Sequence, residues 1–216
     1  MTIWFASGNN HKKKELANIL TASGILSGVK NVSWELKIPA DAGLDFDPDE
    51  TGSSFIDNAL IKAAELHKLL EEKRPTFYKS GSPVIADDSG ICVDALNGRP
   101  GIHSSLYGGK NLGAAERNAK LLTELGGNPL RNARFVCAMV LYFGPNRFYI
   151  AQESLEGVLV ENTEAARGKG GFGYDPILYI PDLGRTVAEL SDEEKNRLSH
   201  RGKAGRAIAQ FLNSIS

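Results

Sequence analysis

The sequence has few of the features that mark specialised classes of protein. Two cysteines among 216 residues are too few for a disulfide-rich scaffold. Cys92 and Cys137 both lie in apolar, strand-like runs, so we expect two buried, reduced thiols in a cytoplasmic protein. No apolar run approaches the roughly 20 residues of a membrane span. The first residues lack the pattern of a signal peptide, and we expect no membrane partner.

An excess of charge of one sign is also lacking, because the formal net charge is −1. This balance argues against a nucleic acid as partner. The charges are nonetheless segregated into an acidic run within residues 41–50 and basic runs within 12–14 and 195–206. Such patches suit a metal ion with a polyanionic ligand, although solvated surface charge is an alternative. The four histidines have no ligand-like spacing, which argues against a transition-metal site.

What is present is an ordinary globular composition, with 42% hydrophobic and 24% charged residues. Short apolar or alternating runs predict strands at 3–6, 32–38, 84–87, 91–96, 134–143, 147–160 and 177–180. Helical spacing and capping residues predict helices after 10, from 53 or 54 to about 73, over 114–125, after 191 and after 202. The order predicts a mixed α/β sheet flanked by helices. Run 134–143 is placed centrally, since both of its faces are apolar.

The first strand leads into a segment that opens a helix and reads Ser7, Gly8, Asn9, Asn10, His11 and Lys12. The free N–H groups and partial positive charge of a helix N-terminus favour phosphate. Gly8 lets the backbone approach a ligand, and Lys12 adds a positive charge. The spacing differs from that of a P-loop. Ordinary helix capping also explains this segment when it is taken alone.

Asp87 and Asp88 are adjacent carboxylates that we expect at the end of a strand. Adjacent strand residues point to opposite faces, so one carboxylate can hold a metal ion or a water while the other holds the loop. A plain turn is the alternative. The acidic loop that ends in Asp49 and Glu50 offers a further ligand. Magnesium uses one or two carboxylates with waters and phosphates, which suits Asp88 with Glu50.

Two segments near the C-terminus carry groups suited to a base. Glycines on both sides of Phe172 free its ring to stand out as a stacking platform, although a core position is the alternative. Ser199, His200 and Arg201 lie at a helix start in a basic stretch. Their side chains can bind a carbonyl oxygen or a phosphate, and helix capping is the alternative there.

Taken together, the segments resemble the inosine triphosphate pyrophosphatase family, also called dITP/XTP pyrophosphatases. The resemblance covers nearly the whole chain, and the short motifs occur together in the family's order. They lie at 7–9 with Lys12 and Glu15, then at 50–52, 55–59, 86–90, 98–101, 133–135, 170–176, 188–190, 194–195 and 199–202. One departure concerns a run that in many bacterial members carries an arginine before a tyrosine. Here Leu106 precedes Tyr107, which puts in doubt any contact of that run with substrate or a partner subunit.

The resemblance implies one domain over residues 1–216, with an elongated mixed sheet in two lobes, a central active-site cleft, and a homodimer. It implies Mg²⁺-dependent hydrolysis of ITP, dITP and XTP to the monophosphate and pyrophosphate, which cleanses the nucleotide pool of deaminated purines. The alternatives are a related pyrophosphatase for other modified nucleotides and a non-catalytic nucleotide or RNA sensor.

The resemblance also implies roles for individual residues. Asp88 is the catalytic carboxylate and a metal ligand. Glu50 is the second metal ligand, with Asp49 as its alternative. The residues expected to bind substrate are Ser7, Gly8, Asn9, Asn10, His11 and Lys12 at the triphosphate, Ser89, and Phe172, Gly173, Tyr174, Asp175, Lys195, His200 and Arg201 at the base. Donors that read the 6-keto oxygen of the base account for specificity.

Overall fold

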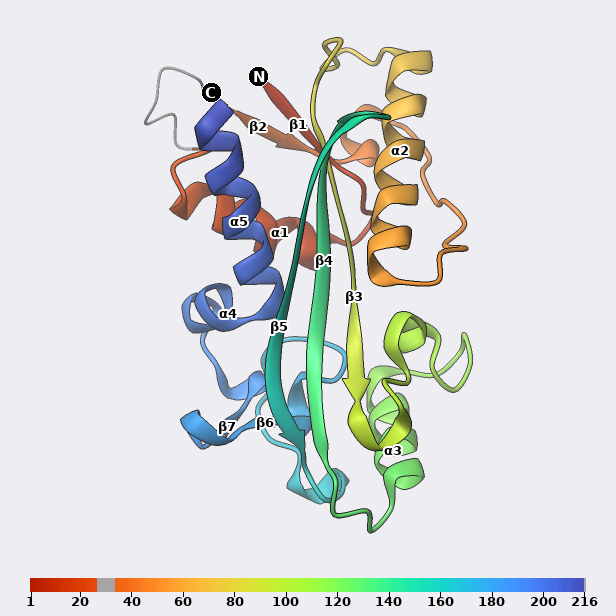
Figure 1. Cartoon of the computed structure of the whole chain (residues 1–216), viewed down its shortest axis with the longest axis vertical. Coiled ribbons are helices and arrows are strands. Elements are labelled where there is room, and N and C mark those ends of the chain that lie inside the picture. Colours follow the sequence, from red (N-terminus) through yellow and green to blue (C-terminus); the bar gives the residue numbers. More distant parts are fainter. Residues whose placement is uncertain (27–33, 216) are drawn as a thin grey trace. The chain divides into compact units, whose positions relative to one another are not determined.

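The computed structural model describes residues 1–26 and 34–215, which form a seven-stranded mixed sheet with flanking helices (Figure 1). The strand order is β2-β1-β3-β4-β5-β6-β7. The strands are β1 (Thr2–Phe5), β2 (Glu35–Lys37), β3 (Val84–Val93), β4 (Asn132–Gly144), β5 (Arg147–Leu159), β6 (Leu178–Ile180) and β7 (Arg185–Thr186). β1 pairs in parallel with β2 and β3, whereas β6 is antiparallel to β5 and β7. This confirms the predicted α/β class and the central place of β4.

All of the helices but the last begin close to the residues that the capping pattern predicts. They are α1 (Asn10–Ala22), α2 (Phe55–Lys73), α3 (Ala114–Leu125), α4 (Asp192–Leu198) and α5 (His200–Ile215). The Ser54 side chain caps α2 by accepting a hydrogen bond from the Asp57 N–H. Gly126 follows the last residue of α3, and Ser191 with Glu194 forms the predicted capping box of α4. In the described part of the chain, no helix is both long and apolar enough to cross a bilayer.

The chain divides into two compact units. The first comprises Met1–Asp88, Cys137–Glu153 and Arg201–Ser216, and the second comprises Ser89–Val136 and Ser154–His200. Strands β3, β4 and β5 contribute residues to both. The cleft that the resemblance implies between two lobes stays a prediction.

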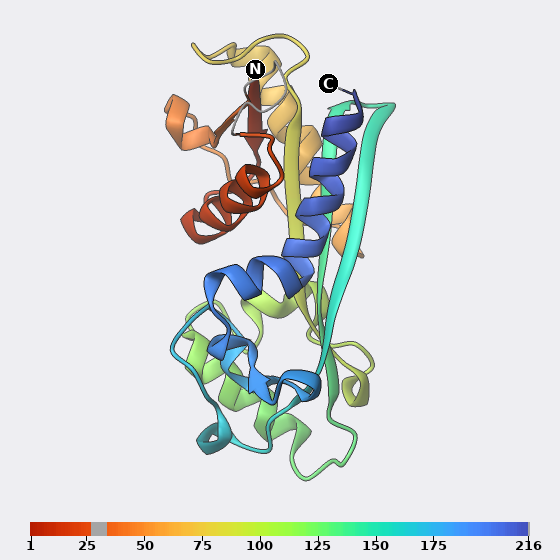
Figure 2. The same ribbon diagram turned by 90° about the vertical axis from the view of Figure 1, so that its left-hand side faces the viewer.

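The first unit packs its strands between α1 and α5 on one face and α2 on the other (Figures 1 and 2). Ile3 and Phe5 of β1 pack with α1 and α5, while Trp4 between them packs with α2. In β3, Ile85 joins the first of these cores and Ala86 the second. The alternation is the ordinary period of two of a strand buried on both faces. It sets the direction in which the polar residues that follow in β3 point.

The second unit has its own core around α3 and the C-terminal part of β3. Leu121, Leu122 and Leu125 form the apolar side of α3 and pack with Ile91 of β3 and Leu178 of β6. The segment between β5 and α4 lies on the same core through Tyr174. The loop that carries Phe172 is therefore anchored to the hydrophobic core of the second unit.

Several expectations about local structure are corrected. β3 runs unbroken through residues 88–90, whereas the sequence predicts two strands separated by a turn, and residues 94–96 form a 3₁₀ helix. Helix α5 begins at His200, before the predicted start after Gly202. Cys137 is buried as expected, but Cys92 is only half-buried. β2 covers only part of the expected strand 32–38, whose first two residues lie outside the described part of the chain.

Candidate active site

Asp87 is the centre of a buried ion-pair network in the first unit. The Nζ of Lys12 lies 2.9 Å from Asp87 Oδ2 and 3.1 Å from Oδ1. The Nε of Arg201 lies 3.4 Å from the same Oδ2, and its Nη1 donates to Glu15 at 2.5 Å. Burial alone would raise the pKa of Asp87, but Lys12 and Arg201 hold it well below its usual range. The Asp87 carboxylate is thus ionised and fully compensated.

Asp88 points to the opposite face of β3, where α2 supplies its partners. The amide of Asn58 donates to Asp88 Oδ2 at 3.1 Å, and the Nζ of Lys62 lies 3.5 Å from Oδ1. Burial raises the pKa of Asp88 above its ordinary value, and Lys62 and Asn58 offset this only in part. Two adjacent carboxylates thus have opposite environments. This confirms the prediction that they face opposite ways, but they lie within a strand and not at its end.

Lys62 is the residue on which two carboxylates converge. Its Nζ lies 2.8 Å from Glu50 Oε1, in addition to its contact with Asp88. Burial alone would lower the pKa of Lys62, but the surrounding carboxylates, Asp87 first, raise it. The ammonium therefore stays charged and marks a position where positive charge is stabilised by the protein.

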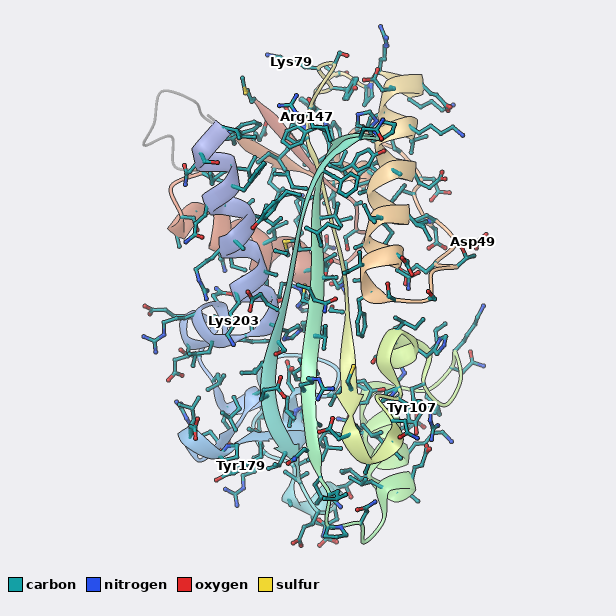
Figure 3. All side chains as sticks on the ribbon, in the orientation of Figure 1. Asp49, Lys79, Tyr107, Arg147, Tyr179 and Lys203 are labelled. Carbon is teal, nitrogen blue, oxygen red and sulfur yellow. The ribbon has the colours of Figure 1, made fainter. Side chains whose placement is uncertain are left out.

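The donor set at this position fits a magnesium ion better than a transition metal. In the described residues, no group of three or more histidine, cysteine or acidic side chains has the arrangement of a metal site. Magnesium needs only one or two carboxylates when substrate phosphates and waters complete its shell. Glu50 and Asp88 meet that requirement, since both reach towards Lys62. Both Asp49 and Glu50 are exposed, but Glu50 contacts Lys62 whereas Asp49 points away from the strands in Figure 3, which favours Glu50 over Asp49.

The segment before α1 is capped as well as exposed. Asn9 is the N-cap residue, and its Oδ1 accepts from the N–H groups of His11 at 2.9 Å and Lys12 at 3.2 Å. The Ser7 hydroxyl oxygen accepts from the Asn9 N–H at 3.1 Å. The capping alternative is therefore realised. Gly8, Asn9, Asn10 and His11 are exposed, so the helix N-terminus remains accessible to a ligand and its phosphate role stays a prediction.

In the second unit, the glycine-rich loop presents Phe172 to solvent. The flanking glycines have left-handed φ angles of +72° at Gly171 and +64° at Gly173, which favour glycine. The Phe172 side chain is 37% exposed, which excludes the core alternative. The Nζ of Lys195 lies 4.7 Å from its ring centroid and 2.8 Å from Asp175 Oδ2. Phe172, Asp175 and Lys195 are thus brought together as the resemblance implies.

The other predicted base residues are more deeply buried. Tyr174 is 6% exposed and donates its hydroxyl hydrogen to the Ser104 carbonyl at 2.8 Å. The buried His200 ring stacks on Phe135, with centroids 5.0 Å apart. Ser89 is half-buried on β3. No ligand contact of these side chains is tested, and their roles at the base stay predictions.

Two polar residues next to these groups, Lys62 and Asn118, were not identified from the sequence, and a third, Asn58, was included only within the motif at 55–59. Asn58 and Lys62 interrupt the apolar side of α2, at helical spacing among Phe55, Ala59, Ala63, Leu66 and Leu70. Asn118 does the same on α3, and its amide donates to the Gly173 carbonyl at 3.1 Å. A polar side chain within an apolar helical stripe was the available signal in all three cases.

Known proteins match the chain over nearly its whole length. The model of the Ham1 family matches residues 3–211. A dITP/XTP pyrophosphatase of Treponema denticola is 45% identical over 215 residues, covering 98% of each chain. One from Geobacillus kaustophilus is 41% identical over 204 residues, covering 94% of this chain and 89% of the relative. The solved Ham1 protein of Staphylococcus aureus has a TM-score of 0.82 at 33% identity, with 100% of both chains covered. The resemblance inferred from the sequence is confirmed, and the chain belongs to the Ham1 family.

Proposed function

We propose that this protein is a nucleoside triphosphate pyrophosphohydrolase that converts ITP, dITP and XTP to the monophosphate and pyrophosphate. The names of its relatives support a pyrophosphatase that acts on dITP and XTP. The observation that carries the proposal is the division of labour between two adjacent carboxylates. Asp87 is neutralised by Lys12 and Arg201, whereas Asp88 keeps a raised pKa on the other face of β3. A raised pKa suits a carboxylate that accepts a proton during a reaction near neutral pH.

The reaction is a substitution at the α-phosphorus. A bond forms between the water oxygen and this phosphorus, the bridging bond to the β-phosphate breaks, and pyrophosphate leaves. Asp88 orients the water and accepts its proton, while Asn58 holds the other side of the carboxylate. Lys62 and Lys12 supply positive charge to the phosphate oxygens, in a reaction driven mainly by positioning and charge stabilisation. The segment of residues 7–12, which is exposed at 8–11, binds the triphosphate.

Magnesium is the cation we propose for the position defined by Glu50 and Asp88. When bound, it supplies Lewis-acid polarisation and neutralises charge on the phosphate oxygens. The two carboxylates hold the ion, and Lys62 keeps their charges compensated when no metal is present. Calorimetric titration with Mg²⁺ measures the number of metal ions bound.

Base recognition is assigned to the Phe172 face and to donors that read the 6-keto oxygen. The exposed Phe172 ring offers a stacking surface worth about 1–3 kcal/mol per base. Lys195 and His200 supply the donors, whereas the Arg201 guanidinium is held by Asp87 and Glu15. ATP presents a donor at position 6, so these groups would lose their acceptor, and a site built for a polar group rejects its absence by up to ~10⁴-fold. We further propose a cytoplasmic homodimer that cleanses the nucleotide pool.

The proposal is tested by following ITP turnover with phosphorus NMR in water enriched in ¹⁸O, with and without Mg²⁺. The expected products are IMP and pyrophosphate, with the label in IMP because water attacks the α-phosphorus. Label in pyrophosphate would place the attack at the β-phosphorus and contradict the mechanism. A parallel panel of XTP, GTP, ATP and CTP measures specificity. Equal kcat/KM for ITP and ATP would contradict the proposed function.

A further inference from the structure

The loop that presents Phe172 is held by polar contacts on residues that follow the ring directly. The Gly173 carbonyl accepts from the Asn118 amide of α3 at 3.1 Å. The Tyr174 hydroxyl donates to the Ser104 carbonyl at 2.8 Å. These contacts fix two consecutive residues to two different elements of the second unit. They therefore restrict the orientation of the Phe172 ring.

The Asn118 contact is difficult to explain by stability alone. The side chain is only 6% exposed, and its Oδ1 has no hydrogen-bond partner in the described part of the chain. A buried unsatisfied oxygen costs free energy that offsets much of what the single hydrogen bond contributes. Leu121, Leu122 and Leu125 form the same side of α3, so a leucine would suit position 118 as well. What the asparagine adds is a fixed position for the Gly173 carbonyl.

The Ser104 end of the second contact is itself rigid. Its hydroxyl oxygen accepts from the Ile91 N–H of β3 at 2.9 Å and donates to the Gly101 carbonyl at 2.6 Å. The short 3₁₀ helix Gly101–Leu106 lies so close to β3 that a Cβ at Gly90 would come within 2.3 Å of the Gly101 carbonyl oxygen. Tyr174 thus connects the loop to a short helix that is itself held against β3.

We propose that Asn118 and Tyr174 are positioning residues for base recognition, which hold the Phe172 ring face and the Lys195 ammonium above it in the orientation that a purine base needs. The inference rests on the proposed function. It assigns the Tyr174 side chain to the support of the loop and not to contact with substrate. Because both hydrogen bonds position the loop that contacts the base, their loss should leave the affinity of the protein for the triphosphate group unchanged.

The variants Asn118→Leu and Tyr174→Phe test this inference, because each removes one hydrogen bond and little volume. Tyr107→Phe is the matched control, since its hydroxyl bonds Glu124 on the surface of the same unit. We expect each test variant to raise the KM for ITP by roughly five- to tenfold, the size of one net hydrogen bond. The kcat at saturation and the inhibition constant of inorganic tripolyphosphate, which has no base, should match wild type. The melting temperature should fall by no more than the loss of one buried hydrogen bond requires.

The two contacts hold one loop, so the double variant should show less than the product of the single effects on KM. A merely structural role predicts a different pattern, in which the active fraction falls, kcat drops, and ITP and tripolyphosphate are affected alike. That pattern, or an unchanged KM for ITP in both variants, would overturn the inference while wild-type turnover of ITP stands. Absence of ITP turnover in the wild type would instead contradict the proposed function.

Discussion

The two units hold their functional groups by different physical means. In the first, groups from α1, α2 and α5 hold Asp87 and Asp88. Lys12 and Arg201 lower the pKa of Asp87 against the effect of burial, whereas burial raises the pKa of Asp88. In the second, Phe172 is held through hydrogen bonds to neighbouring main-chain groups, including its own N–H, which donates to Asp175. The first arrangement sets charge, whereas the second sets the direction of an aromatic face.

With the proposed function, this difference means that ion pairs support the chemistry and hydrogen bonds support base recognition. Ion pairs tolerate small displacements because Coulomb energy falls slowly with distance. A stacking surface depends on orientation, so its support must be directional, as hydrogen bonds to carbonyl groups are. Changes in the first unit should therefore affect rate and stability, and changes in the second should affect base affinity.

The largest effect is expected for Asp88→Asn. The amide keeps the shape of the carboxylate but cannot accept the proton of water, so kcat should fall by about 10²- to 10⁴-fold. Pyrophosphate release from ITP at saturating Mg²⁺ measures this loss. Circular dichroism and thermal unfolding provide the control, since the fold should be retained. Wild-type rates in this variant would remove Asp88 from the mechanism.

A loss of stability is expected for Arg201→Met, because Arg201 is a partner of both Glu15 and Asp87. Breaking a buried ion pair by removing one partner costs about 3–5 kcal/mol. Arg134→Met in the second unit is the matched comparison, since Arg134 pairs with Asp94 at the surface. An exposed pair contributes about 0–1 kcal/mol. Urea unfolding of both variants measures the difference, and similar losses would contradict the contrast between the units.

A smaller effect is expected for Phe172→Ala. The loss of a stacking face should weaken ITP binding by about 1–3 kcal/mol, while the free energy of unfolding changes little because the ring is exposed. Titration calorimetry with ITP measures the affinity, and Phe172→Tyr, which keeps a stacking face, serves as control. Collapse of thermal stability with retained affinity would show that Phe172 supports the core.

The smallest effect concerns the two thiols. Burial raises the pKa of Cys137 to about 12, and burial also raises the pKa of the half-buried Cys92. The reactive thiolate is therefore scarce at pH 8, and its fraction grows as pH rises. We expect Cys92 of the second unit to react slowly with a thiol reagent, and faster at pH 9. Cys137 of the first unit should react only on unfolding, and its faster labelling would contradict the described packing.

The sequence predicts the bounds of helices well where a capping residue marks the helix end. Ser54, Gly126 and Ser191 cap helices within their own neighbourhood, so their roles are readable without tertiary contacts. The run 88–90 was misread as a turn because a Ser-Gly pair next to two aspartates has that local preference. Partners from α1, α2 and α5 satisfy the aspartates and allow β3 to continue.

The candidate site was predicted in part for the same reason. Family motifs identify Asp88, Glu50 and the Phe172 loop, because those segments are contiguous in sequence. Lys62 and Asn118 were missed because their partners lie far away in the chain, at Glu50 and Asp88 for the first and at Gly173 for the second. Only the folded chain brings these groups together.

The central claim is that two adjacent carboxylates are divided between fold and chemistry, and urea unfolding of Asp87→Asn and Asp88→Asn at pH 7 tests it most directly. The pKa of Asp87 is lower in the folded protein than in the unfolded chain, so its ionised carboxylate stabilises the fold at pH 7. The pKa of Asp88 is raised on folding, so its ionised carboxylate destabilises the fold at pH 7. Asp87→Asn should lose about 3–5 kcal/mol of unfolding free energy. Asp88→Asn should be as stable as wild type or more so. Equal losses, or a greater loss in Asp88→Asn, would contradict the account.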